Sequence, residues 1–118
     1  MRENTLYHNP NCSKSRAALE LINQKNLNVK VREYLNNPPT KEELEFICEY
    51  LKISPIKIIR TNEKLFNELE FSTNDNLTND QWFSIISNHP ILMERPILIY
   101  NQKVAIGRPI ENILNIIS

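Results

Sequence analysis

The stretch that most constrains the fold covers residues 5–16 and has the sequence TLYHNPNCSKSR. Its first residues are apolar and aromatic, which is typical of a short buried strand, and the triplet Asn9-Pro10-Asn11 is a turn sequence. Apolar residues then recur at helical spacing across residues 17–22. We therefore expect a strand, a tight turn and a helix, with Cys12 where the helix opens.

A cysteine at the start of a helix has a distinctive chemistry. The first backbone N–H groups of a helix have no partner within the helix, and together with the helix dipole they favour the thiolate over the thiol. A small cysteine that only fills a turn is the alternative. The strand–turn–helix setting of Cys12 favours the reactive thiolate.

The rest of the chain alternates strands and helices. Residues 28–34 alternate apolar and polar like a half-buried strand, which completes a βαβ unit with parallel strands and a right-handed crossover. Residues 95–100 and 103–106 flank a two-residue turn, Asn101-Gln102, and predict an antiparallel hairpin. Residues 110–117 predict a closing helix. Between these parts, residues 40–88 predict an all-helical insertion, in which Thr40 with Glu43 and Thr78 with Gln81 form capping boxes.

The order βαβ, helical segment, ββα is that of a thioredoxin-like fold with an insertion. We expect an α/β protein in which two helices flank a four-stranded mixed sheet, and residues 1–118 form a single domain. Cys12 then lies at the carboxyl end of the first strand, where open α/β sheets place their ligand sites.

Composition excludes several function classes. Fourteen basic residues balance fourteen acidic ones, which argues against nucleic-acid or membrane-surface binding, because both need a basic field. No apolar run approaches the roughly 20 residues of a membrane span, and no signal region is visible. Two cysteines make no disulfide framework, so a reduced, cytoplasmic protein is expected. The single glycine, Gly107, excludes Rossmann and P-loop nucleotide sites, which need several.

Three arginines stand at predicted junctions beside a turn or a proline: Arg60, Arg95 and Arg108. Arginine suits planar, bidentate recognition of oxyanions. Taken singly, each is typical of a solvated surface. Together with Cys12 they predict a cradle that would lower the pKa of the thiol further.

The two histidines and the second cysteine have fewer possible roles. His8 precedes Cys12 by four residues and, as an imidazolium, could support the thiolate or, when neutral, accept the thiol proton; a hydrogen bond to backbone is its alternative role. His8 and Cys12 are too few ligands for zinc, so no metal site is expected. Cys48 lies in the apolar stripe of a predicted helix and is expected in the core, and His89 at a helix end.

Over essentially its whole length the chain resembles the glutaredoxin-coupled arsenate reductases of the ArsC family. The resemblance rests on motifs in matching order and spacing: Tyr7-His8-Asn9-Pro10-Asn11-Cys12-Ser13 with Ser15-Arg16, Tyr34-Leu35-Asn36-Asn37-Pro38-Pro39, Ile59-Arg60, His89-Pro90-Ile91-Leu92, Arg95-Pro96-Ile97 and Gly107-Arg108-Pro109.

The resemblance implies roles for these residues. Cys12 would be the nucleophile, His8 would activate it and Ser15 would hydrogen-bond to it. Arg60, Arg95 and Arg108 would bind the oxyanion, and the bond before Pro96 would be cis. The resemblance further implies arsenate as substrate, glutathione as co-substrate, glutaredoxin as partner and no bound cofactor.

Two other functions fit the same fold. Related proteins regulate transcription by binding RNA polymerase and usually carry a Cys-x-x-Cys switch, whereas Cys12-Ser13-Lys14-Ser15 contains one thiol. A general monothiol oxidoreductase that acts on glutathione mixed disulfides is the other alternative. The lack of a second thiol in the turn also means that any reduction chemistry at Cys12 needs an external thiol.

Overall fold

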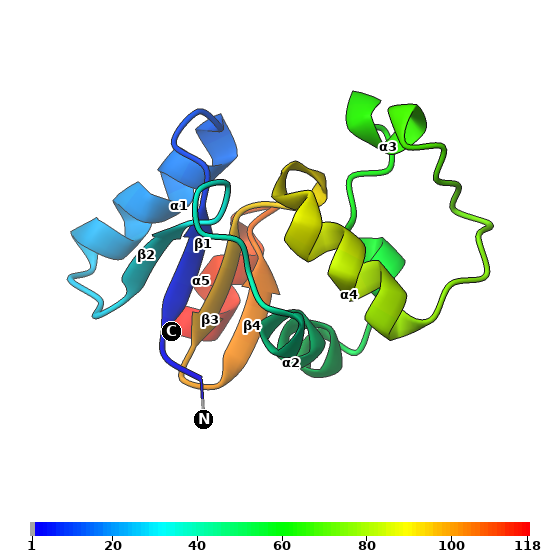
Figure 1. Cartoon of the computed structure of the whole chain (residues 1–118). Coiled ribbons are helices and arrows are strands. Elements are labelled where there is room, and N and C mark those ends of the chain that lie inside the picture. Colours follow the sequence, from blue (N-terminus) through cyan, green and yellow to red (C-terminus); the bar gives the residue numbers. More distant parts are fainter. Residues whose placement is uncertain (1) are drawn as a thin grey trace. The chain divides into compact units, whose positions relative to one another are not determined.

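The computed structural model describes residues 2–118, which divide into two compact units. The first unit comprises residues 2–37 and 95–118, and the second comprises Pro38–Glu94. Each unit is described by itself, and Figure 1 traces both along the chain.

A mixed sheet of four strands forms the centre of the first unit. Its strands are β1 (Thr5–His8), β2 (Lys30–Glu33), β3 (Ile97–Tyr100) and β4 (Lys103–Ile106). They lie in the order β2-β1-β3-β4, with β1 parallel to β2 and the other two pairs antiparallel (Figure 1). The predicted thioredoxin-like α/β fold is therefore confirmed.

Two helices, α1 (Ser13–Gln24) and α5 (Glu111–Ile117), complete the core of this unit. Leu6, Leu98 and Ala105 lie side by side in register across three strands, so their side chains share one sheet face. The core cluster of buried side chains joins these three to Ala18 and Ile22 of α1 and to Ile113 of α5. Both helices therefore pack on the same face of the sheet, a detail that the expectation of two flanking helices had left open.

The β3–β4 hairpin turns as predicted. Asn101 and Gln102 form the two-residue turn and have φ angles of 49° and 63°, which suits the twist of the flanking strands. The peptide bond between Arg95 and Pro96 is cis, as the family resemblance implied, and the Arg108–Pro109 bond is cis as well.

The second unit is built from helices and short helical turns. They are α2 (Lys41–Leu51), η1 (Pro55–Ile58), α3 (Lys64–Glu68), α4 (Asn79–Asn88) and η2 (Pro90–Leu92). Both predicted capping boxes are present, at the starts of α2 and α4. Backbone hydrogen bonds from Arg60 N–H to Leu92 O and from Glu94 N–H to Ile58 O tie the end of this segment back to its middle.

The helical insertion is therefore slightly longer than the predicted residues 40–88, since the compact unit spans Pro38–Glu94. That both units belong to one domain of residues 1–118 stays a prediction. No helix within residues 2–118 is both long enough and apolar enough to cross a membrane.

Truncation of Leu98 tests the shared core of the first unit. Leu98 is fully buried in the core cluster that joins the sheet to both helices, so we expect Leu98→Ala to lower the free energy of unfolding by about 2–5 kcal/mol. Leu114→Ala is the matched control, because Leu114 is 38% exposed and should cost less than about 1 kcal/mol. Urea unfolding followed by circular dichroism measures both, and equal losses would contradict the assigned core.

Candidate functional site

Cys12 is held between the end of β1 and the start of α1. The chain leaves β1 at His8 and turns tightly, with Cys12 N–H donating to Asn9 O at 3.0 Å. Asn11 N–H donates to the Asn9 side-chain oxygen at 3.0 Å, which closes the turn locally. Helix α1 begins at the next residue, so Cys12 occupies its N-cap position with extended backbone geometry. The predicted strand, turn and helix are confirmed.

The sulfur of Cys12 is surrounded by hydrogen-bond donors. Arg108 Nη2 donates to Sγ at 3.2 Å, and the backbone N–H groups of Ser15 and Lys14 also bond to it. Burial of the thiol acts to raise its pKa, but these donors and the charge of Arg95 outweigh burial, so the pKa of Cys12 lies below its ordinary value. The site therefore favours a nucleophilic thiolate.

His8 and Ser15 form a buried pair beside this turn. His8 Nδ1 and Ser15 Oγ are 2.6 Å apart, and the same hydroxyl accepts the Asn9 backbone N–H at 2.9 Å. Burial lowers the pKa of His8 more than the negative charge of Glu33 raises it, and the charge of Arg16 adds to the lowering. Of the two roles that the sequence allowed for His8, the structure favours the neutral imidazole.

Ser15 contacts Cys12 through its backbone and His8 through its side chain. Its backbone N–H bonds to the Cys12 sulfur, whereas its hydroxyl is engaged with His8 and Asn9. The side chain is fully buried. Ser15 thus connects the histidine to the turn that carries the thiol.

Arg95 and Arg108 meet because of the hairpin register. Ile97 pairs with Ile106 at the end of the ladder, and one step beyond them Gly107 N–H donates to Pro96 O at 2.8 Å. A further step brings the two arginines opposite each other, where Arg108 Nε donates to the Arg95 carbonyl at 2.8 Å. The predicted two-residue turn already implied this pairing, so counting outward from the turn would have found it.

Arg60 belongs to the second unit, and its partners there are acidic. Its Nη1 lies 2.7 Å from Glu63 Oε2, and its Nε lies 3.9 Å from Glu94 Oε1. The pair with Glu63 was predictable from the sequence, because Glu63 stands three residues after Arg60, a spacing at which side chains meet on a helical turn. The expected role of Arg60 as an oxyanion ligand stays a prediction.

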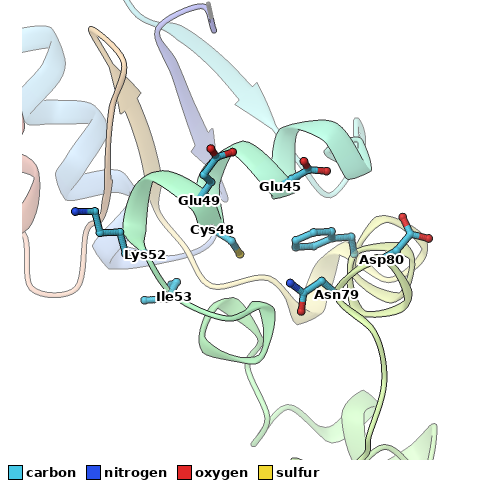
Figure 2. A pocket seen from close by; sticks show the side chains of 8 residues that line it. Glu45, Cys48, Glu49, Lys52, Ile53, Asn79 and Asp80 are labelled. Atoms are coloured by element: carbon cyan, nitrogen blue, oxygen red, sulfur yellow. The ribbon is translucent and has the colours of Figure 1, made fainter.

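The second thiol, Cys48, has the opposite environment. It is 5% exposed on α2, as expected for a core residue, and burial raises its pKa to about 11. Figure 2 shows its sulfur facing the space between α2 and α4, where a hollow of about 580 Å³ lies. The hollow is lined by Glu45, Cys48, Glu49, Lys52, Ile53, Asn79, Asp80 and Phe83. None of the predicted site residues lines this hollow. The Cys48 thiol is a poor nucleophile, because its raised pKa keeps it protonated at neutral pH.

The remaining candidate residues are His89 and the side chains of the types that ligate metal ions. His89 caps the C-terminal end of α4, as predicted. Within residues 2–118, no three side chains of His, Cys, Asp or Glu gather closely enough to hold a metal ion.

Removal of the Arg108 side chain should make the thiolate form of Cys12 less favourable. We expect Arg108→Ala to raise the pKa of Cys12 and slow its alkylation at neutral pH several-fold, because one charged donor to sulfur is lost. The measurement is the pH dependence of the iodoacetamide reaction in a Cys48→Ala background, which leaves one thiol. Arg108→Lys is the control and should keep part of the effect through its charge. An unchanged titration in Arg108→Ala would contradict the assigned contact.

The buried His8 predicts a pH dependence of stability. The folded pKa lies below the value of about 6.5 expected in the unfolded chain. Between these two values the unfolded chain binds more protons, so the free energy of unfolding should fall as the pH falls through this interval. His8→Gln removes this titration, and its melting temperature should decline less over the same interval. Identical slopes in both proteins would show that His8 is not the group responsible.

Comparison with known proteins places this chain in a family. The family model described as ArsC family matches residues 7–116. The chain is 43% identical over 114 residues to an arsenate reductase of Neisseria meningitidis serogroup A, covering 96% of this chain and 97% of that protein. It is 34% identical over 113 residues to an arsenate reductase of Escherichia coli K12, covering 96% of this chain and 79% of the relative.

Solved structures agree. A putative arsenate reductase from Yersinia pestis superimposes with a TM-score of 0.88 at 38% identity, over 96% of this chain and 99% of that one. An arsenate reductase from Vibrio cholerae gives a TM-score of 0.87 at 34% identity, over 98% and 100% of the two chains. The family match, the sequence identities and the shared fold together show that this chain belongs to the ArsC family.

Proposed function

We propose that this protein is an arsenate reductase in which Cys12 is the nucleophile. The observation that carries the proposal is the hydrogen bond from the guanidinium of Arg108 to the Cys12 sulfur, at 3.2 Å. Membership of the ArsC family and the names of its relatives support arsenate as the oxyanion.

The reaction begins at the sulfur. The Cys12 thiolate attacks arsenic, an S–As bond forms, and hydroxide or water leaves. Neutral His8 accepts the thiol proton before attack, and the hydroxyl of Ser15, 2.6 Å from Nδ1, holds the imidazole ring in one orientation. Because the donors around the sulfur lower the pKa of Cys12, this proton leaves more easily than it would from an ordinary thiol.

Arginine side chains neutralise the oxyanion in this proposal. Arg108 and Arg95 come from adjacent positions at the end of the hairpin, and their positive charges would face the oxygens on arsenic. Arg60 is proposed as a third ligand, which would require it to exchange its ion pairs with Glu63 and Glu94 for the substrate.

An external thiol supplies the electrons. The turn around Cys12 contains one thiol, and Cys48 is buried in the other unit with a pKa of about 11. We propose that glutathione attacks the thiol–arsenate adduct and that glutaredoxin resolves the mixed thiol species. The glutathione sulfur bonds to the Cys12 sulfur, and the S–As bond breaks with its electron pair passing to arsenic, which leaves as arsenite. Glutaredoxin then takes the glutathione from this mixed disulfide and regenerates the Cys12 thiol. The protein would act in the cytoplasm, where glutathione remains reduced, and would need no bound cofactor.

Turnover by the purified protein tests this proposal. Arsenate reduction should require both glutathione and glutaredoxin, and Cys12→Ser should reduce it to the background rate, since a hydroxyl is a far weaker nucleophile at neutral pH. Cys48→Ala is the matched thiol control and should retain most of the activity. Turnover that equals the Cys12→Ser background would refute the proposal, and turnover with glutathione alone would refute the part played by glutaredoxin.

The same preparation separates the alternative oxidoreductase. A general monothiol enzyme would reduce a glutathione mixed disulfide and retain that activity in Arg95→Ala, because the reacting disulfide sulfurs, unlike arsenic in arsenate, carry no oxyanion oxygens for the arginine to bind. An arsenate reductase should instead lose arsenate turnover in this variant. Assays of both substrates with both proteins distinguish the two functions.

A further inference from the structure

Gly107 occupies a position that has no room for a side chain. A Cβ atom built on it would lie 2.6 Å from Ile113 Cδ1 and 2.7 Å from Pro96 Cγ. Such separations are well inside van der Waals contact, which for carbon atoms is about 3.5–4.0 Å. Its φ angle is not positive, so space rather than backbone conformation requires glycine here.

The two obstacles differ in how far they can yield. The Cδ1 atom is the end of a flexible side chain on α5, although Ile113 is fully buried. The Pro96 ring is covalently closed on the backbone, and Pro96 O accepts the Gly107 N–H at 2.8 Å. A side chain at position 107 would therefore push on the main chain at Pro96.

That main chain leads directly to the two arginines. Arg95 precedes Pro96, Arg108 follows Gly107, and Arg108 Nε donates to Arg95 O at 2.8 Å. Arg108 in turn reaches the Cys12 sulfur at 3.2 Å. A shift of a few tenths of an ångström at the contact between Gly107 and Pro96 would be transmitted to the guanidinium, because interiors are close-packed.

We propose that Gly107 is a positioning residue of the active site: its lack of a side chain allows the strand end to pack between Pro96 and Ile113, and this packing sets the Arg108 guanidinium against the Cys12 sulfur and holds Arg95 beside Arg108. Gly107 touches neither the sulfur nor any substrate, so its effect passes through the two arginines. Its importance for arsenate turnover rests on the proposed function, whereas its effect on the thiol does not.

The experiment compares Gly107→Ala with the double variant Gly107→Ala/Ile113→Val, both in the Cys48→Ala background. Valine lacks Cδ1, so the double variant removes the closest contact, that of 2.6 Å with Ile113 Cδ1. It keeps the contact of 3.4 Å with Cγ1 and the one of 2.7 Å with Pro96. We expect it to recover melting temperature relative to the single variant. In both variants the iodoacetamide reaction of Cys12 should slow several-fold at neutral pH, and its pH profile should move upward. KM for arsenate should rise by about tenfold, as expected for displaced substrate ligands.

Leu98→Ala serves as the control for stability alone. It lies in the same core and should lower the melting temperature without moving the thiol titration. If Gly107→Ala leaves that titration unchanged, or if Leu98→Ala moves it equally, the proposal is wrong. The proposal would also be overturned if neither Gly107→Ala nor Gly107→Ala/Ile113→Val folds, since the lack of a side chain at Gly107 would then serve stability rather than the position of the arginines.

The outcomes also separate this inference from the proposed function. A wild-type protein that does not reduce arsenate, combined with a Gly107→Ala protein whose thiol titration is shifted, would refute arsenate reduction and support the positioning role. Arsenate turnover in the wild type together with an unshifted Gly107→Ala titration would support arsenate reduction and refute the positioning role of Gly107.

Discussion

The hydrogen bonds that converge on the Cys12 sulfur are the feature on which the site depends. Burial acts to raise the pKa of this thiol, and the surrounding donors outweigh burial, so the pKa lies below its ordinary value. Two backbone N–H groups come from the first turn of α1, and one guanidinium comes from Arg108, ninety-six residues away. The helix start alone would favour the thiolate only modestly. The charge-assisted hydrogen bond from Arg108, which follows strand β4, adds to the stabilisation of the thiolate form of Cys12.

The two cysteines show how environment decides reactivity. Both are buried, yet the pKa of Cys12 is lowered, whereas that of Cys48 is raised to about 11. Cys48 faces the hollow between α2 and α4, and burial is the only cause of its shift. Donors around the sulfur, and not burial itself, therefore distinguish the candidate nucleophile from the structural cysteine.

The hairpin carries out several tasks with few residues. Its positive-φ turn at Asn101 and Gln102 sets the register, and the register places Arg95 opposite Arg108 at the other end. Beyond the last ladder pair, Gly107 allows the chain to pack closely against Pro96 and Ile113. The same two strands contribute Leu98 and Ala105 to the core, so the arginines are attached to a part of the protein that is firmly packed.

By itself, the sequence determined the local elements. The strand–turn–helix at Cys12, the capping boxes of α2 and α4 and the β3–β4 turn depend on residues a few positions apart, and the structure confirms each of them. The sequence motifs around Cys12 and the three arginines were also enough to predict the ArsC family, which the family match confirms. Only the tertiary structure decided that α1 and α5 share one sheet face, that burial lowers the pKa of His8, that the Ser15 hydroxyl lies against His8 Nδ1, and that Glu94 pairs with Arg60. These features depend on burial and on side-chain contacts set by packing, which the pattern of residues along a single chain does not contain.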